Sequence, residues 1–102
     1  MWARYAISLQ AQLHNMNISF IIATFNGSLY IEETIHSLIT QMKPHDEIIV
    51  VDDASTDDTL EKLKLFKYQQ FKVISLKKNI GAAGARNEGL NLAIGDYVVF
   101  ID

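Results

Sequence analysis

The chain of 102 residues contains no cysteine and only one proline. Without cysteine it can form neither a disulfide nor a thiolate metal site, which fits a reducing compartment. No apolar run approaches the ~20 residues that a membrane-spanning helix needs. The 9 basic residues are outnumbered by 12 acidic ones and form no stripe, so a nucleic-acid partner is not expected.

The first 17 residues, "MWARYAISLQAQLHNMN", contain one Arg and no long apolar block, so they match a signal peptide poorly. Two interpretations stay open for them: a short amphipathic helix, or an extension upstream of Met16, which we favour. Hydrophobic residues make up 49% of the chain and charged residues 21%, a globular composition. We therefore treat residues 1–17 as an N-terminal extension and residues 18–102 as one folded unit.

Four segments rich in β-branched residues predict strands, at residues 18–24, 47–52, 71–76 and 97–101. The first two are continuously apolar, as expected for strands buried on both faces. Helical patterns separate the four segments. Strands that alternate with helices predict a Rossmann-like α/β fold, with a mostly parallel sheet of about four strands flanked by helices.

Hydroxyl residues suggest where the helices begin. Ser28 is expected to cap a helix that starts at Leu29 and ends before Pro44, and Ser55 with Asp58 resembles a capping box for the next helix. A third helix is expected to follow the Gly/Ala-rich loop after residue 77. Its predicted inner side is made of Ala83, Leu90, Ala93 and Ile94.

Polar residues follow the predicted strands at their carboxyl ends, where open α/β sheets bind ligands. Asp52 and Asp53 stand directly after the apolar run Ile48 to Val51. Neighbours on a strand face opposite sides, so we assign one carboxylate to structure and the other to a ligand. The alternative is that both cap the helix near Ser55. The opposite edge of the sheet is expected to contain ordinary turns only.

Two further side chains are candidates for the same edge. Phe25 could stack a planar base, or could simply be a core aromatic. Arg86, early in the third helix, needs an anionic partner, either a ligand or one of the aspartates. The surrounding "GAAGARNEG" matches neither GxGxxG nor GxxxxGK, so both phosphate-loop motifs are rejected.

Four segments together resemble the N-terminal half of a family 2 glycosyltransferase of the GT-A fold: "SFIIATFNG", "EIIVVDDASTDDT", "NIGAAGARNEGL" and "GDYVVFID". They occur in the family's order and spacing between Ile18 and Asp102. One departure is Ala23, which stands where the family usually has proline. The resemblance implies that residues 18–102 form a nucleotide-binding α/β half-domain that stops at the Asp-x-Asp motif.

By position, the resemblance implies that Ala23, Thr24 and Phe25 line a base pocket. Asp53 would bond the base edge, with Asp52 in a supporting role. The expected ligand is a nucleotide-diphosphate sugar, with a UDP-sugar as the first choice.

Arg86 would face the nucleotide near its phosphates or base. Asp102 would be the first acid of Asp-x-Asp, which holds a divalent cation, Mn²⁺ or Mg²⁺, that bridges the diphosphate. The resemblance also implies sugar transfer by a longer protein, in the cytoplasm or at the inner face of the membrane. No catalytic residue is expected within the chain itself, so we expect it to be inactive alone and prone to self-association through its last strand. The sugar and the acceptor, a glycan or a lipid, stay unassigned.

Two other functions remain open from the residues alone. A response-regulator receiver domain also carries paired acids after a buried strand, and Asp102 stands about 50 residues after Asp52. A full strand–helix unit precedes the acids here, which disfavours that interpretation. A non-catalytic nucleotide-binding or assembly module with the same fold is the third possibility.

Overall fold

The computed structural model describes residues 16–101. Most of the predicted extension and Asp102 therefore lie outside the described residues. The strands are β1 (Ile18–Thr24), β2 (Glu47–Asp52), β3 (Phe71–Ser75) and β4 (Tyr97–Ile101). The helices are α2 (Ile31–Ile39), α3 (Thr59–Leu63) and α4 (Ala82–Leu92). The four predicted strands are confirmed, the third ending one residue earlier than expected.

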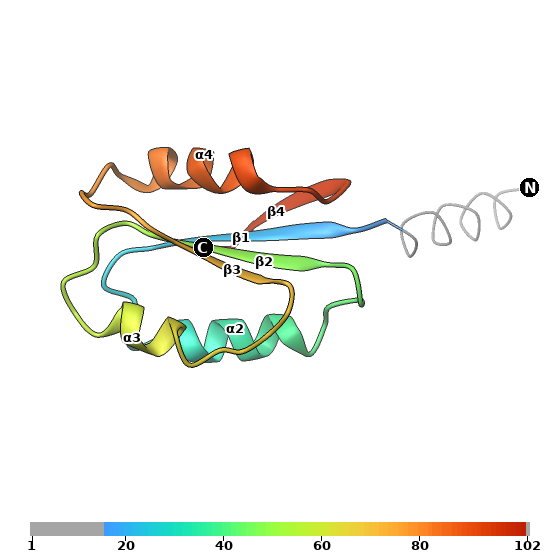
Figure 1. The fold of residues 1–102 in the computed structure, drawn as a ribbon, viewed down its shortest axis with the longest axis horizontal. Coiled ribbons are helices and arrows are strands. Elements are labelled where there is room, and N and C mark those ends of the chain that lie inside the picture. Colours follow the sequence, from blue (N-terminus) through green and yellow to red (C-terminus); the bar gives the residue numbers. More distant parts are fainter. Residues whose placement is uncertain (1–15, 102) are drawn as a thin grey trace, which may run out of the picture.

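The strands form one sheet in the order β3-β2-β1-β4, and all three pairings are parallel. Helices α2 and α3 cover one face and α4 covers the other (Figure 1). The predicted Rossmann-like architecture is thus confirmed. In the register of the sheet Thr24 pairs with Asp52, and Asp52 with Ser75, so the carboxyl ends of three strands share one edge.

The core has two halves, one on each face of the sheet. Ile22, Ile48 and Val50 face the α2 side, where they pack with Ile31, Ile35, Leu38 and Leu63. Ile21, Ile49 and Val51 face Ala85 of α4. Every residue of β2 is buried, because this central strand is covered on both faces. Each fully buried apolar side chain of this size contributes about 1.5–3 kcal/mol to folding.

The buried side of α4 differs from the prediction. Ala85 and Gly89 are buried and Ala93 partly so, whereas Ala83, Leu90 and Ile94 are exposed. The prediction followed the larger apolar residues, but the helix approaches the sheet through its smallest ones. A Cβ atom at Gly89 would lie 2.6 Å from Ile21 Cγ2, so only glycine allows this approach.

The predicted helix caps were also wrong. Helix α2 begins at Ile31 after Tyr30, and α3 begins at Thr59 after Asp58, with no capping hydrogen bond from either preceding side chain. The hydroxyl groups have other partners. Ser28 Oγ donates to Asp58 on the loop after β2, and Ser55 Oγ donates to Asp52 three residues earlier and accepts from Asn26 N on the loop after β1. Tertiary partners therefore compete successfully with local capping.

The amino-terminal edge of the sheet contains a buried polar network where only turns were expected. Glu47 is 2% exposed, and its Oε2 accepts hydrogen bonds from Ser19 Oγ (2.6 Å) and Ile94 N (2.8 Å). The Lys72 ammonium lies 2.9 Å from Oε1 and compensates its charge, while no well-directed hydrogen bond from the described residues reaches that atom. Gly95 N in turn donates to Ser19 Oγ at 2.9 Å. The network joins β1, β2 and β3 to the segment that leaves α4.

The close approach of α4 predicts opposite outcomes for two glycines in the same helix. At Gly89 an added methyl group must displace buried Ile21, so Gly89→Ala should lower the free energy of unfolding by about 1–2 kcal/mol despite its better helix propensity. At Gly84 the methyl group meets only Ile80, which is 42% exposed and can move. Gly84→Ala should therefore be neutral or stabilising. Urea unfolding of both variants measures the difference, and equal stabilities would contradict the packing described.

The Glu47 network predicts a loss of stability in acid. Burial alone raises the pKa of Glu47, but the hydrogen bonds from Ser19 and Ile94 and the Lys72 ammonium outweigh it, so the pKa lies below the ordinary value of 4.5. A carboxyl with a depressed folded-state pKa stabilises the fold above its unfolded pKa, and this contribution disappears as pH falls through the folded value. Glu47→Gln should cost about 1–3 kcal/mol at pH 7 and progressively less below pH ~4.5.

Chemical denaturation between pH 7 and pH 3 measures this difference. Glu61→Gln, at an exposed position of α3, is the control and should have little effect at either pH. A cost of Glu47→Gln that does not change with pH would show that the ionised carboxylate is not what stabilises the edge.

Candidate functional site

The carboxyl edge of the sheet contains a small hollow of about 70 Å³. Ala23, Thr24 and Phe25 line it from the end of β1, Asp53 from the end of β2, and Ala82 from the first turn of α4. Four of the residues predicted for a ligand site are thus brought together. Phe25 also borders a second hollow of about 270 Å³, towards the start of α2.

Phe25 is not a core aromatic. Its side chain is 51% exposed, whereas its neighbour Thr24 is buried. The aromatic surface is therefore available to a planar ligand at the edge of the sheet. An exposed aromatic beside a hollow is the arrangement with which proteins stack nucleobases.

Asp53 fastens the loop after β3 to the edge. Its carboxylate accepts hydrogen bonds from Ile80 N at 2.8 Å and Gly81 N at 3.0 Å, and Asn79 Nδ2 donates to its carbonyl oxygen at 3.2 Å. Its own N–H donates to Thr24 O at 2.8 Å. Gly81 directly precedes α4 and has φ +90°, a backbone conformation that favours glycine. Asp53 thereby sets the position of the first turn of α4. Each carboxylate oxygen keeps further acceptor capacity for a ligand.

Asp52 turns to the other side. It is 2% exposed, and its Oδ1 and Oδ2 accept hydrogen bonds from Ser55 Oγ (2.5 Å) and Ser55 N (3.2 Å). Neither aspartate caps α3, so that alternative is wrong. The adjacent carboxylates diverge, as their positions on a strand require. Asp52 does not line the hollow of about 70 Å³, whereas Asp53 does.

Arg86 lies one helical turn after Ala82, so both residues project from the same side of α4. Its Cζ atom is 6.0 Å from the centroid of the Phe100 ring on β4, within the range of a cation–π contact. The guanidinium is therefore directed along the sheet towards the end of β4. Asp102, the predicted metal ligand, follows that strand and lies outside the described residues.

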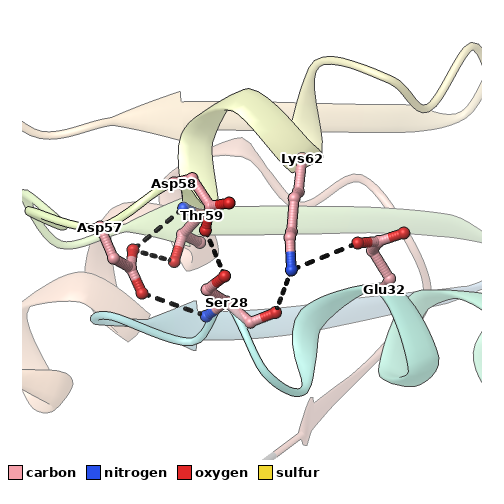
Figure 2. A network of polar contacts seen from close by, with 6 residues as sticks. All are labelled: Ser28, Glu32, Asp57, Asp58, Thr59 and Lys62. Atoms are coloured by element: carbon pink, nitrogen blue, oxygen red, sulfur yellow. Dashed lines mark hydrogen bonds and ion pairs between the residues drawn. The ribbon is translucent and has the colours of Figure 1, made fainter.

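The loops after β1 and β2 are bonded to each other by charged residues (Figure 2). Ser28 N donates to Asp57 at 3.3 Å, and Ser28 Oγ donates to Asp58. Lys62 Nζ on α3 donates a hydrogen bond to Ser28 O at 2.8 Å and lies 3.5 Å from the Glu32 carboxylate. Sequence reasoning missed the contact between Lys62 and Ser28 because 34 residues separate them. Hydrogen bonds from Thr59 are the main reason that the pKa of Asp57 is lowered.

Two kinds of feature are missing from residues 16–101. They contain no group of three or more His, Cys, Asp or Glu side chains that could hold a metal ion. None of the helices in this range has the length and hydrophobicity of a membrane span.

Several proteins with similar sequences carry the names of glycosyltransferases. TuaG of Bacillus subtilis (strain 168), which carries the name of a teichuronic acid biosynthesis glycosyltransferase, is 44% identical over 87 residues. That alignment covers 83% of this chain and 34% of TuaG. The chain therefore spans about a third of the length of this relative.

Two of the solved structures that share the fold contain a bound nucleotide or nucleotide sugar. TarS 1–349 of S. aureus in complex with UDP superposes with a TM-score of 0.78 at 38% identity, over 85% of this chain and 27% of that one. The mannosyltransferase PcManGT from Pyrobaculum calidifontis was solved in complex with GDP-Man and Mn²⁺. It superposes with a TM-score of 0.73 at 29% identity, over 79% of this chain and 25% of that one.

The family comparison decides between the interpretations that the residues left open. The profile described as Glycosyl transferase family 2 matches residues 19–102, nearly the whole of the folded unit. This match confirms the resemblance inferred from the four segments, and the receiver-domain interpretation is wrong. The four-stranded parallel sheet with helices on both faces is the Rossmann-like part of a GT-A fold. The chain belongs to glycosyl transferase family 2.

Proposed function

We propose that this chain is the donor-binding region of a glycosyltransferase and that it binds the nucleotide of a nucleotide-diphosphate sugar. The observation that carries the proposal is the meeting of Ala23, Thr24, Phe25 and Asp53 in one hollow at the carboxyl edge of the sheet. Residues from two strands and the first turn of a helix meet there, although they are distant in the sequence. Similarity to TarS, whose structure contains UDP, supports a UDP-sugar as the donor.

In this proposal each side chain has a separate task. The exposed Phe25 ring stacks on the base, and Asp53 accepts a hydrogen bond from the N–H edge of the base through its remaining acceptor positions. Thr24 and Ala23 form the floor. Asp52, bonded to Ser55, supports the site without contacting the ligand. Arg86 meets the negatively charged diphosphate, which a guanidinium recognises well.

A divalent cation, Mn²⁺ or Mg²⁺, is part of the same proposal. It is supported by PcManGT, whose structure contains Mn²⁺ together with GDP-Man. Asp102 is the residue proposed to bind it, because by position it matches the first acid of the family's Asp-x-Asp motif. When bound, such a cation offsets the negative charge of the diphosphate.

Sugar transfer itself is proposed for a longer protein. The chain spans only about a third of TuaG and a quarter of the solved relatives, so we expect nucleotide binding without transfer. Transfer of sugar by the purified chain would contradict this expectation. The location proposed is the cytoplasm or the inner face of the membrane, and the acceptor stays unassigned.

Self-association is also proposed, through the edge of β4. Tyr97, Val99 and Phe100 are 49%, 38% and 43% exposed on this strand, which pairs only with β1 among the described residues. An apolar strand with an unpaired edge is a template for another chain. Analytical ultracentrifugation of the chain measures it directly.

The donor site predicts a selective loss of nucleotide binding when Asp53 is changed. Calorimetric titration with UDP, with and without Mn²⁺, should show binding by the parent chain. Asp53→Asn should weaken it at least about tenfold, because one charged acceptor is lost and hydrogen bonds to charged groups are worth about 1.5–3 kcal/mol. A parallel titration with GDP tests the choice of base.

Asp96→Asn is the matched control. Asp96 accepts a hydrogen bond from Asn17 N at the opposite edge of the sheet, so this variant should bind UDP like the parent. Thermal unfolding of each variant shows whether it is folded. If the folded parent bound neither UDP nor GDP, a non-catalytic assembly module would be the better interpretation.

A further inference from the structure

Asn26, the residue after Phe25, is bonded through both its main chain and its side chain. Its N–H donates to Ser55 Oγ at 2.8 Å. Its Oδ1 accepts hydrogen bonds from Thr56 N at 2.7 Å and from Asp57 N at 3.2 Å. All three of these partners lie on the loop after β2.

The backbone of Asn26 is in an uncommon conformation. Its φ is +52°, in the left-handed region that Asn and Asp tolerate better than other residues with a side chain. The next residue, Gly27, folds back on the strand so closely that a Cβ atom there would lie 2.3 Å from Thr24 Oγ1. The chain thus reverses sharply directly after Phe25, and bonds to the neighbouring loop hold the reversal.

These bonds lead back to the centre of the sheet. Ser55 Oγ accepts from Asn26 N and donates its single proton to Asp52 Oδ1 at 2.5 Å, which uses the hydroxyl in both directions. Asp52 is the last residue of the fully buried β2. A continuous series of hydrogen bonds therefore runs from the buried strand end through Ser55 to Asn26.

A second connection holds the same loop two residues later. There Ser28 is bonded to Asp57, Asp58 and Lys62 (Figure 2). Phe25 consequently lies between a strand and a doubly bonded turn, while its ring stays half exposed. A fixed backbone with an exposed ring is a preorganised arrangement, because little freedom remains to be lost when a ligand binds.

We propose that Asn26 is a positioning residue for the nucleotide site. Hydrogen bonds to the side-chain carbonyl of Asn26 hold the turn after β1 and thereby orient the Phe25 ring for stacking. This inference rests on the proposed function of the hollow. Asn26 acts through Phe25, by accepting the N–H groups of Thr56 and Asp57. The paired aspartates then have parallel tasks. Asp52 positions the turn that carries Phe25, through Ser55 and Asn26. Asp53 positions the first turn of α4, through Ile80 and Gly81.

A tryptophan reporter tests the proposal. Phe25→Trp combined with Trp2→Phe moves the only tryptophan of the chain into the site. In this background Asn26→Gly removes the side-chain acceptor yet permits the left-handed backbone and keeps the N–H for Ser55. Asn26→Asp restores an acceptor in a residue that also tolerates positive φ. Asn91→Ala, at an exposed position of α4, is the control.

Two readouts are measured on variants that thermal unfolding shows to be folded. Without ligand, time-resolved anisotropy should show faster motion of the reporter in Asn26→Gly than in the parent reporter. With UDP, quenching of the reporter should give an affinity about 3- to 10-fold lower for Asn26→Gly, reflecting the cost of ordering one side chain. Asn26→Asp should restore most of the parent's affinity and slow reporter motion, and Asn91→Ala should behave like the parent in both readouts.

The outcomes separate this inference from the donor-site proposal. If the parent reporter binds UDP, and Asn26→Gly shows the same affinity and the same reporter motion, the positioning role is overturned and the donor site stands. Equal losses in Asn26→Gly and Asn26→Asp would also overturn it. If Asn26→Gly does not fold, Asn26→Ser, whose shorter side chain lacks the amide carbonyl, is the second variant and must show the same two changes. Failure of the parent reporter to bind any nucleotide would overturn both proposals.

Discussion

Divergence of two neighbouring carboxylates at the end of β2 organises the carboxyl edge of this protein. Successive side chains on a strand face opposite sides, so Asp52 and Asp53 cannot serve the same loop. Asp52 bonds to Ser55, and through it to the turn after β1, while Asp53 bonds to the loop before α4. Both are almost fully buried, and buried carboxylates need such partners. Three loops are thereby bonded to the end of a single strand.

The other constraint is the short distance between α4 and the sheet. Ala85 and Gly89 form the contact, because larger residues would hold the helix away from Ile21. Close packing brings Ala82 into the lining of the hollow and directs Arg86 towards Phe100. The small residues of α4 therefore contribute to the site by allowing a short distance between the helix and the sheet, although they form no phosphate-binding motif. At the far end of α4 the Glu47 network secures the segment leaving the helix.

The two edges of the sheet differ in role: the amino-terminal edge stabilises the fold, and the carboxyl edge carries the candidate site. At the amino-terminal edge a buried carboxylate, a hydroxyl group and a lysine join three strands to the end of α4. At the carboxyl edge similar polar groups leave an aromatic ring exposed beside a hollow. Membership of glycosyl transferase family 2 fits this division, since open α/β sheets bind ligands beyond the carboxyl ends of their strands.

The sequence by itself determined the strands, their alternation with helices and the set of residues at one edge. A continuous run such as Ile48 to Val51 favours a buried strand, because β-branched side chains suit the extended backbone and their apolar surface gains free energy when it is buried. The spacing of the four segments was also enough to identify the family. Only the tertiary structure decided the buried side of α4, the partners of Ser28 and Ser55, and the Glu47 network. Each of those depends on backbone distance or includes contacts between groups 28 to 47 residues apart, and local periodicity contains no information about either.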